Sequence, residues 1–310
     1  MPIFAATKSG TCDESQWFVL SPSMTGTILG IEGGGTKTVA LLSTAAGKIV
    51  ARRQFGPLNL KLSSDQQVLA VLGKFKPTHA AICLAGCRTL TDRARLRRLA
   101  RRVWPTAHMI IGNDLDSGLA AAFGSTQPGI LVISGTGSVV VGRNTAGAVV
   151  RTGGWGHLLG DHASGYWIAL TGLRAAIRDL DRTGQSSAAL RRLLQRLKLK
   201  SPEQLVGWIA GAGKAEIAEH ADIFLRGNRG LLLQAASFLA MDALAVADQL
   251  KITAPAVVLA GGLLQNQPIL RRWVTHRIQQ TLPGATVKLL RRDPAAGAVR
   301  LAQNLHDHGR

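Results

Sequence analysis

The chain has 310 residues, of which 46% are hydrophobic and 5% aromatic, and 37 basic against 18 acidic residues give it a formal net charge of +19. This length allows two domains, and the composition is that of an ordinary α/β protein, which excludes wholesale disorder. The longest apolar segment, residues 230–250, is interrupted by Gln234, Asp242, Asp248 and Gln249. A membrane span needs roughly 20 predominantly apolar residues. We therefore interpret this segment as a buried helix and expect no membrane association.

The N-terminal segment and the cysteines indicate a cellular location. Residues 1–26 contain Asp13 and Glu14 and lack the basic and apolar regions of a secretory signal. We expect a disordered leader there, with Met24 as a natural start. The three cysteines, Cys12, Cys83 and Cys87, show no C-x-x-C spacing for a metal, so we expect a reducing cytoplasm, with Cys83 and Cys87 filling apolar core.

The basic residues fall on predicted amphipathic helices. Arginines between Arg93 and Arg102 alternate with Leu96 and Leu99 at helical spacing, and residues 191–200 repeat this pattern. We interpret both segments as helices with solvated basic faces. No known binding module or interleaved aromatic residues accompany the charge, which disfavours a nucleic-acid partner. Association with nucleic acid or an anionic membrane through these faces stays an alternative that high salt would test.

In chain order, the periodicity predicts the same series of elements twice. The first series has three antiparallel strands within residues 27–55, a helix near 65–74, a strand at 80–86, the basic helix, a strand at 108–112 and a helix at 115–123. The second has strands within 129–136, 138–144 and 148–153, a long helical region at about 161–250, a strand at 256–262, a helix near 268–280, a strand at 286–290 and a last helix.

This repeated βββαβαβα order predicts an α/β protein with two similar domains. We place the first at residues 27–123, together with the final helix at 293–308, and the second at 124–292, with a helical insertion. No low-complexity linker separates them, so we expect a hinge and a cleft.

Two glycine-rich turns are predicted to bind phosphate. The segment IEGGGTKT, residues 31–38, lies between two apolar strands, and LVISGTGSVVV, residues 131–141, repeats this arrangement. Glycines allow φ > 0 and the close approach of backbone N–H groups to an anion, while hydroxyls and a lysine add further donors. The candidate nucleotide-binding residues are Gly33, Gly34, Gly35, Thr36, Lys37, Thr38, Gly135, Thr136 and Gly137.

Asp114 is the candidate catalytic residue. It follows a predicted strand and opens a helix, a place from which side chains reach into the crevice of an α/β sheet. Together with Asn113 it could instead cap that helix, and a lone aspartate in this setting is more often a cap. Phosphoryl transfer needs anion-binding sites, magnesium and a carboxylate that accepts the hydroxyl proton. Because Asp114 lies between the two phosphate turns in the sequence, we favour it as the base, with Asp116 in reserve.

Two further segments are predicted to line a ligand site. The glycine-rich stretch 153–167 precedes a helix, and its Asp161 can cap that helix or bind a ligand. His157 and His162 lack the i, i+4 spacing of a helical zinc pair, which disfavours a metal. The glycines of AGG, residues 260–262, allow a flat base to approach the backbone, although an ordinary left-handed turn explains them almost as well.

The motifs GGGTKT, ND, ISGTGS, GGWGHLLGD and VVLAGG, in this order, resemble the BadF/BadG/BcrA/BcrD-type ATPases, and among them most of all the N-acetylglucosamine kinases. The resemblance extends from residue 27 to the final helix. It implies a duplicated ribonuclease H-like fold of the actin and hexokinase type, with ATP in the central cleft. It further implies ATP- and Mg²⁺-dependent phosphorylation of an amino sugar, at the 6-hydroxyl of N-acetylglucosamine or a close relative such as glucosamine.

The resemblance also assigns roles by motif position. Asp114 would be the base, residues 33–38 and 135–137 would hold phosphates, and Gly261 and Gly262 would border adenine. The sugar would contact Asn59, Gly154, Trp155 and Asp161, and Glu32 would hold magnesium through water.

Three departures from the family pattern stand out. Glu32 stands where many members have Asp, GDHAS replaces the usual GDEGS, with His162 and Ala163 at the changed positions, and LRGNRG near Arg226 lacks the acidic residue expected after its first glycine. GDHAS and the basic helices motivate the alternative, a non-catalytic regulatory protein that binds ATP and a sugar. The identity of the sugar and the oligomeric state, with a homodimer as one option, are not determined by the sequence.

Overall fold

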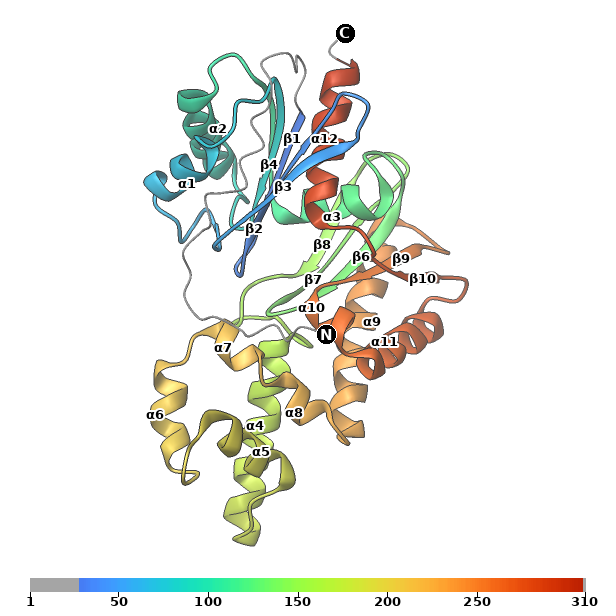
Figure 1. The fold of residues 1–310 in the computed structure, drawn as a ribbon. Coiled ribbons are helices and arrows are strands. Elements are labelled where there is room, and N and C mark those ends of the chain that lie inside the picture. Colours follow the sequence, from blue (N-terminus) through green and yellow to red (C-terminus); the bar gives the residue numbers. More distant parts are fainter. Residues whose placement is uncertain (1–27, 309–310) are drawn as a thin grey trace, which may run out of the picture.

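A computed structural model describes residues 28–308, which form two five-stranded mixed sheets (Figure 1). The first sheet has the order β3-β2-β1-β4-β5, with β1 Ile28–Gly33, β2 Thr38–Ser43, β3 Ile49–Phe55, β4 His79–Leu84 and β5 His108–Gly112. The second has the order β10-β9-β6-β7-β8, with β6 Gly129–Ser134, β7 Ser138–Arg143, β8 Val149–Gly153, β9 Ala256–Ala260 and β10 Thr286–Leu289. Read from β8 to β10, the strands of the second sheet follow the same order as those of the first sheet read from β3 to β5. The predicted duplication is therefore confirmed.

The helices of the first half agree with the predicted ones, and the predicted long helical region of the second half consists of six separate helices. The first half contains α1 Asp65–Leu72, α2 Leu90–Val103 and α3 Asp114–Phe123. The predicted region at 161–250 is divided into α4 Gly165–Thr183, α5 Ala188–Leu197, α6 Gln204–Gly211, α7 Lys214–Ala218, α8 Ala221–Leu225 and α9 Arg229–Leu250. Gly184 and Lys198 end α4 and α5 in left-handed conformations with φ of 66° and 56°, and a helix stops at such residues. The remaining helices are α10 Gly262–Asn266, α11 Pro268–Thr281 and α12 Pro294–His308.

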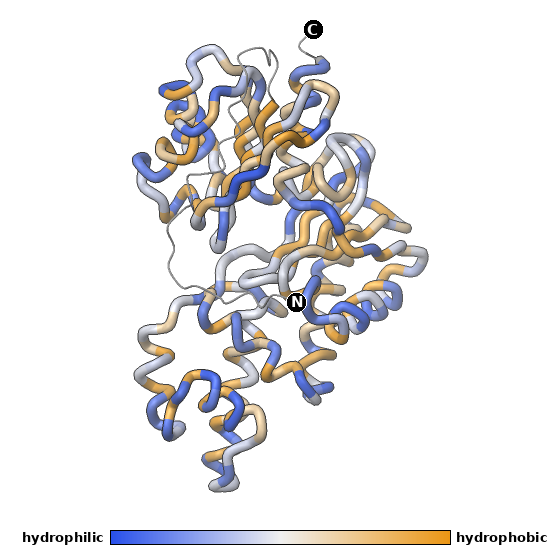
Figure 2. The backbone as a smooth tube through the Cα atoms, in the orientation of Figure 1, coloured by the Kyte–Doolittle hydropathy of each residue, from blue (hydrophilic) through white to orange (hydrophobic). Residues whose placement is uncertain are grey.

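Apolar residues are concentrated on the strands of both sheets (Figure 2), and α9 belongs to the core beneath the second sheet. Within residues 28–308, α9 is the one helix long and apolar enough to cross a membrane, and half of its apolar window is buried inside the fold. It packs against β7, β8 and α11. This burial agrees with the prediction of a core helix, although Leu233 and Met241 are exposed.

Parallel pairing brings separate loops to the same edge of each sheet. β1 pairs with β4 and β4 with β5, all parallel, so the loops after these three strands lie together. In the second sheet β6 and β10 both run parallel to β9, so the loops after these three strands also lie together. Ligand sites of α/β proteins form at the carboxyl ends of such strands, and every predicted phosphate turn lies at one of these ends.

Helices α3 and α12 lie between the sheets, and two glycines allow them to approach the backbone closely (Figure 1). A Cβ at Gly297 of α12 would lie 1.9 Å from the carbonyl oxygen of Ser117 in α3, and one at Gly30 of β1 would lie 2.3 Å from the amide nitrogen of Val299. On its other side, α3 buries Leu119 against the second sheet. The last helix of the chain therefore covers the first sheet.

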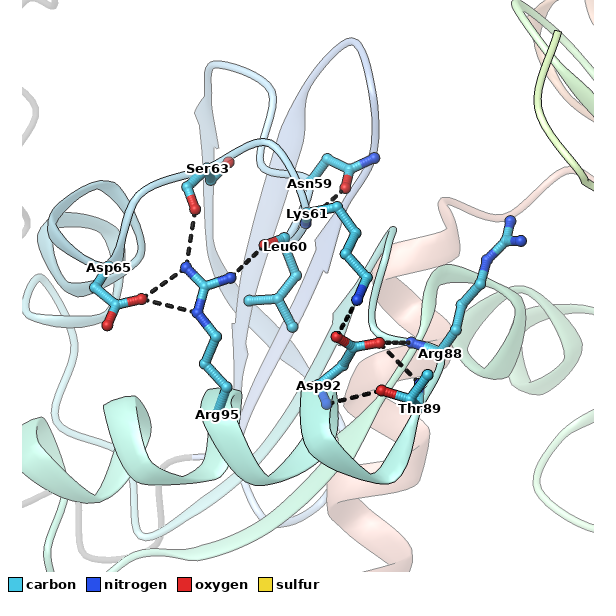
Figure 3. Close-up of polar contacts among 9 residues, drawn as sticks. All are labelled: Asn59, Leu60, Lys61, Ser63, Asp65, Arg88, Thr89, Asp92 and Arg95. Carbon is cyan, nitrogen blue, oxygen red and sulfur yellow. Dashed lines mark hydrogen bonds and ion pairs between the residues drawn. The ribbon is translucent and has the colours of Figure 1, made fainter. Parts of the chain in front are cut away.

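Polar contacts attach the loop after β3 to α2 (Figure 3). Arg95 donates to the Asp65 carboxylate at 2.8 Å and to the carbonyl oxygens of Leu60 and Ser63 at 2.5 and 3.0 Å. The Lys61 Nζ atom lies 2.5 Å from a carboxylate oxygen of Asp92, whose other oxygen accepts from the N–H groups of Arg88 and Thr89. The other arginines of α2 at positions 97, 98, 101 and 102 are exposed, in agreement with the predicted solvated face.

We expect Gly297→Ala to lower the free energy of unfolding by about 1–3 kcal/mol, because the added methyl group overlaps backbone that cannot move freely. Gly207 is the matched control, since it lies in the exposed helix α6 with no atom near an added Cβ. Gly207→Ala should be neutral or stabilise the fold by up to about 1 kcal/mol. Urea unfolding of both variants tests this, and equal stabilities would contradict the close α3–α12 crossing.

We expect Asp92→Asn to be destabilising at neutral pH and much less so in acid. The hydrogen bond from Lys61, followed by the Thr89 N–H group, holds the pKa of Asp92 below its usual range. A lowered folded-state pKa stabilises the fold above the unfolded-state value of about 3.9, and this contribution is lost as the pH falls towards the folded-state value. Urea unfolding at pH 7 and pH 3 should show the larger difference from the wild type at pH 7. Asp179→Asn, at an exposed pair with Arg182, should have a small effect at either pH.

Candidate active site

The first phosphate turn joins β1 to β2 at the end of the first sheet that faces the second half (Figure 1). The N–H group of Gly34 donates to the carbonyl oxygen of Lys37 at 2.9 Å, which leaves the residues between them exposed. The expected positive φ is wrong for Gly33, Gly34 and Gly35. Gly33 is instead needed for space, because a Cβ there would meet Leu84 and the backbone of Leu58 at under 3 Å.

Threonines of the first turn differ in their surroundings. Thr38 is buried, and its hydroxyl donates to the carbonyl oxygen of Gly56 at 2.8 Å. Since a hydroxyl has one proton to donate, Thr38 serves the fold in this arrangement and its phosphate role stays a prediction. Thr36 and Lys37 are exposed at the tip of the turn.

The second phosphate turn joins β6 to β7 and lies beside the predicted adenine loop. The N–H group of Gly135 donates to the carbonyl oxygen of Gly137 at 2.9 Å. A Cβ at Gly135 would lie 3.4 Å from the amide nitrogen of Gly262. Gly261 has φ 95°, and a side chain there would overlap the backbone of Ser134, so only glycine fits. Thr136 is half-buried at the tip. No hydrogen bond or ion pair joins the two turns within the described residues.

Asp114 is the first residue of α3 and does not cap it. Asn113 is the N-cap, since its side chain accepts from the N–H groups of Leu115 and Asp116 at 2.8 and 3.1 Å. Asp116 completes the capping box by accepting from the Asn113 N–H group. The reserve candidate is therefore held by the cap, while the carboxylate of Asp114 is free of it. Burial raises the pKa of Asp114, and the nearby Arg88 opposes this rise.

Glu32 and Asp293 bring two further carboxylates towards Asp114. The pKa of Glu32 is raised to about 7, first by burial, then by the charges of Asp114 and Asp293, with Lys37 opposing the rise. Asp293 directly precedes α12 and forms an ion pair with Arg52 at 3.4 Å. Glu32 thus interacts electrostatically with both aspartates, but the residues that the structure describes contain no group of three His, Cys, Asp or Glu side chains close enough to hold a metal ion by themselves.

Asn59, a predicted sugar contact, is positioned by the loop after β4. It forms a parallel bridge with Ala85, and its side-chain oxygen accepts from the Lys61 N–H group at 3.0 Å. A Cβ at Gly86 would lie 2.3 Å from that oxygen, so glycine is required there. The amide nitrogen of Asn59 points away from Lys61 (Figure 3), which leaves its two N–H donors for a ligand.

The second half contributes Gly154 and Trp155 after β8. Gly154 has φ 67°, and the Trp155 side chain is 64% exposed, which suits stacking on a ligand. The guanidinium of Arg151 lies over the Trp155 ring at 4.9 Å and donates to the carbonyl oxygen of Gly153 at 2.6 Å.

Asp161 is buried and paired with a lysine of the helical insertion. Its carboxylate lies 2.5 Å from the Nζ atom of Lys214, the first residue of α7, and a Cβ at Gly137 would lie 2.9 Å from both groups. The predicted cap is wrong, because the N-cap of α4 is Ser164, whose hydroxyl accepts from the Trp167 N–H group. Asp161 therefore lies beside the second phosphate turn, and its sugar role stays a prediction.

Of the two changed residues of GDHAS, Ala163 is buried, whereas His162 is exposed and contacts aromatic rings of two helices. The ring of His162 stacks on Phe238 at 4.7 Å and contacts Trp167, while Ala163 is fully buried. The Ser138 hydroxyl donates to the His162 carbonyl oxygen at 2.6 Å. In this arrangement His162 packs between helices.

Four charged residues of the site were missed by sequence reasoning: Arg88, Arg151, Lys214 and Asp293. Arg88 follows β4, and Asp293 follows β10, so the carboxyl-end rule that selected Asp114 could have found both. Arg151 and Lys214 carry no such signal, because their position depends on how β8 and α7 pack.

Comparison with known proteins agrees with the fold and the motifs. The pattern of the BadF/BadG/BcrA/BcrD ATPase family matches residues 29–302. The N-acetylmuramic acid/N-acetylglucosamine kinase of Clostridium acetobutylicum is 32% identical over 89% of this chain and 98% of its own length. The N-acetyl-D-glucosamine kinase of Dictyostelium discoideum is 27% identical over 89% and 97%.

A solved structure shows the same fold. The crystal structure of a provisionally assigned N-acetylglucosamine kinase from Chromobacterium violaceum superimposes with a TM-score of 0.71 at 27% identity, covering 89% of this chain and 99% of that one. The duplicated sheets are thus those of the actin and hexokinase type of sugar kinase. With the family pattern spanning nearly all described residues, this chain belongs to the BadF/BadG/BcrA/BcrD ATPase family.

Proposed function

We propose that this protein is an ATP-dependent sugar kinase that phosphorylates the 6-hydroxyl of N-acetylglucosamine or of a closely related amino sugar. The observation that carries the proposal is Asp114, a half-buried carboxylate outside the capping box of α3, with a raised pKa, at the carboxyl-end edge of the first sheet. The kinases of Clostridium acetobutylicum and Dictyostelium discoideum, which match this chain over most of their length, support it.

Asp114 is the proposed base. A carboxylate within hydrogen-bond reach of the sugar hydroxyl accepts its proton as the oxygen attacks phosphorus. Burial raises the basicity of Asp114, and Arg88 keeps part of the ionised form available. The amide of Asn59 and the exposed ring of Trp155 would orient the sugar from opposite halves, so that closure aligns the acceptor oxygen with the phosphoryl group.

ATP would bind along the two phosphate turns. The exposed backbone at Gly35 and Thr36 and the charge of Lys37 would face the transferring phosphate, while Gly261 leaves room for a base beside Ser134. Magnesium, when bound, would offset the negative charge of the phosphates, and Glu32 would hold it through water, with Asp293 nearby. A reducing cytoplasm fits the buried free thiols of Cys83 and Cys87.

A regulatory protein that binds ATP and a sugar without turnover is the second candidate, motivated by GDHAS. A coupled assay of ADP release with glucose, glucosamine and N-acetylglucosamine separates the two functions. We expect N-acetylglucosamine to stimulate ADP release most. ATP binding without sugar-stimulated release would favour the regulatory protein.

Asp114→Asn should lower kcat for N-acetylglucosamine by about 10²–10⁴-fold, because general-base catalysis contributes this much. Loss of one carboxylate near Glu32 should keep the affinity for ATP within a few-fold of the wild-type value. Isothermal titration calorimetry with a non-hydrolysable ATP analogue measures this affinity. Asp179→Asn is the surface control and should retain the wild-type kcat. Near-normal turnover in the Asp114 variant would refute its role as the base.

A further inference from the structure

A lysine of the helical insertion lies against the second phosphate turn. Lys214 is the first residue of α7, and its Nζ atom is 2.5 Å from a carboxylate oxygen of Asp161. A Cβ at Gly137 would lie 2.9 Å from this Nζ atom, so the ammonium group contacts the backbone of the turn. Helices α4 to α8 form the insertion and lie below the second sheet in Figure 1. The insertion therefore contributes a positive charge to a turn that is predicted to bind phosphate.

The two groups of this ion pair differ in their access to a ligand. The side chain of Asp161 is 5% exposed, whereas that of Lys214 is 30% exposed. The N–H group of Ser138 also donates to the second carboxylate oxygen of Asp161, at 3.4 Å. A ligand that approaches the turn has more access to the ammonium group than to the carboxylate, so the pair presents positive charge to it.

The ammonium group of Lys214 has hydrogen-bond donors to spare. A lysine ammonium has three N–H donors and no acceptor. Within residues 28–308 the group makes one hydrogen bond, to Asp161, and no ion pair with any other residue. A buried carboxylate requires a counter-charge, and Lys214 supplies it without using its remaining donors. These donors are available to a ligand at the turn.

The segment that carries Asp161 is fixed to the second phosphate turn. Asp161 and Ala163 have φ of 56° and 64°, left-handed conformations that are costly for residues other than glycine. The Ser134 hydroxyl donates to the Ala163 carbonyl oxygen at 2.7 Å. The Gly165 N–H group donates to the Gly135 carbonyl oxygen at 2.7 Å. Strain that surrounding contacts hold in place is typical of functional sites, and here it fixes the partner of Lys214.

We propose that Lys214 is a nucleotide-binding residue, whose ammonium group donates to a non-transferred phosphate of ATP at the second turn, and that Asp161 positions it. This inference rests on the proposed kinase function and assigns part of its ATP site to the helical insertion. Asp161 then acts through Lys214 and not as a sugar contact.

Phosphate is the ligand that fits this position. A Cβ at Gly135 would lie 3.4 Å from the amide nitrogen of Gly262, so the turn adjoins the predicted adenine loop. In the proposed arrangement Lys37 of the first turn faces the transferring phosphate, which leaves the other phosphates to the second turn. Lysine binds phosphate as a compact point charge and needs no paired geometry. One ammonium group held against the turn is sufficient for this contact.

The test compares the binding of ADP with that of adenosine, which has no phosphate, by isothermal titration calorimetry. Lys214→Gln should raise the Kd of ADP by about ten-fold or more, the usual effect of losing a charge-assisted hydrogen bond. It should change the Kd of adenosine by less than about three-fold, because adenosine offers the ammonium group no charged partner. Lys214→Arg keeps the charge and should bind ADP more tightly than Lys214→Gln does. Lys200→Gln, at an exposed lysine of the same insertion, is the charge-matched control and should bind ADP as the wild type does.

A double variant separates loss of the ammonium group from the effect of an unpaired carboxylate. Removing Lys214 alone leaves the buried Asp161 without a counter-charge, which destabilises the segment and repels phosphate. Lys214→Gln combined with Asp161→Asn replaces the ion pair by two neutral amides that can bond to each other. This double variant should bind ADP as weakly as Lys214→Gln alone. Recovery of the wild-type affinity for ADP would limit Lys214 to balancing Asp161 and refute the phosphate contact.

Steady-state kinetics adds a second readout. Lys214→Gln should raise KM for ATP and change KM for N-acetylglucosamine by less than about three-fold. The reverse pattern, a raised KM for the sugar alone, would make the pair a sugar contact and refute the inference while the kinase function stands. Equal losses of ADP and adenosine binding would indicate a general disturbance of the site and also refute it.

Failure of the kinase function is distinguishable from failure of this inference. If no sugar stimulates ADP release, calorimetry still measures ADP binding. Weaker ADP binding in both Lys214→Gln and the double variant, with adenosine binding retained, would keep the lysine contact and reject the kinase. ADP binding that is unchanged in both variants would reject the lysine contact. Thermal unfolding of each variant establishes that the protein is folded.

Discussion

The packing of α12 against both β1 and α3 is the constraint on which the candidate site depends. Gly30 and Gly297 allow backbone to approach backbone, so the helix lies against the first sheet and against α3 together. Glu32 lies near the end of β1, Asp114 begins α3, and Asp293 immediately precedes α12. Asp114 and Asp293 act electrostatically on Glu32 because the three elements that carry these residues pack together. A larger side chain at either glycine would separate the elements and disperse the charges.

Charged side chains near Asp114 act on the ionisation of this edge of the fold in two ways. Burial, followed by the charges of Asp114 and Asp293, raises the pKa of Glu32 to about 7, and a bound cation would oppose this rise. The charge of Arg88 opposes the rise that burial causes in the pKa of Asp114. Asp114 lies near both groups, within range of the Glu32 carboxylate and of the Arg88 guanidinium. A base in this position has its ionisation influenced from both sides of the reaction.

Most of the fold could be predicted because the evidence for it is local. Alternating and β-branched runs marked the ten strands at nearly their observed bounds, and turn glycines marked the hairpins. The long region at 161–250 was less predictable, since its breaks include Lys198 and Lys251, two lysines in left-handed conformations. A lysine carries no signal for such a conformation. None of the three glycines of the first phosphate turn adopts the expected positive φ, and Gly33 instead avoids overlap with Leu58 and Leu84.

The sequence by itself determined the duplicated order of strands and helices, the two glycine turns and the position of Asp114 at a strand end. These features follow from periodicity and from residue types that are neighbours along the chain. Only the tertiary structure decided that Asn113 caps α3 in place of Asp114 and that Lys214 pairs with Asp161. Such contacts join residues from separate elements, and their geometry depends on how sheets and helices pack, which no local pattern records.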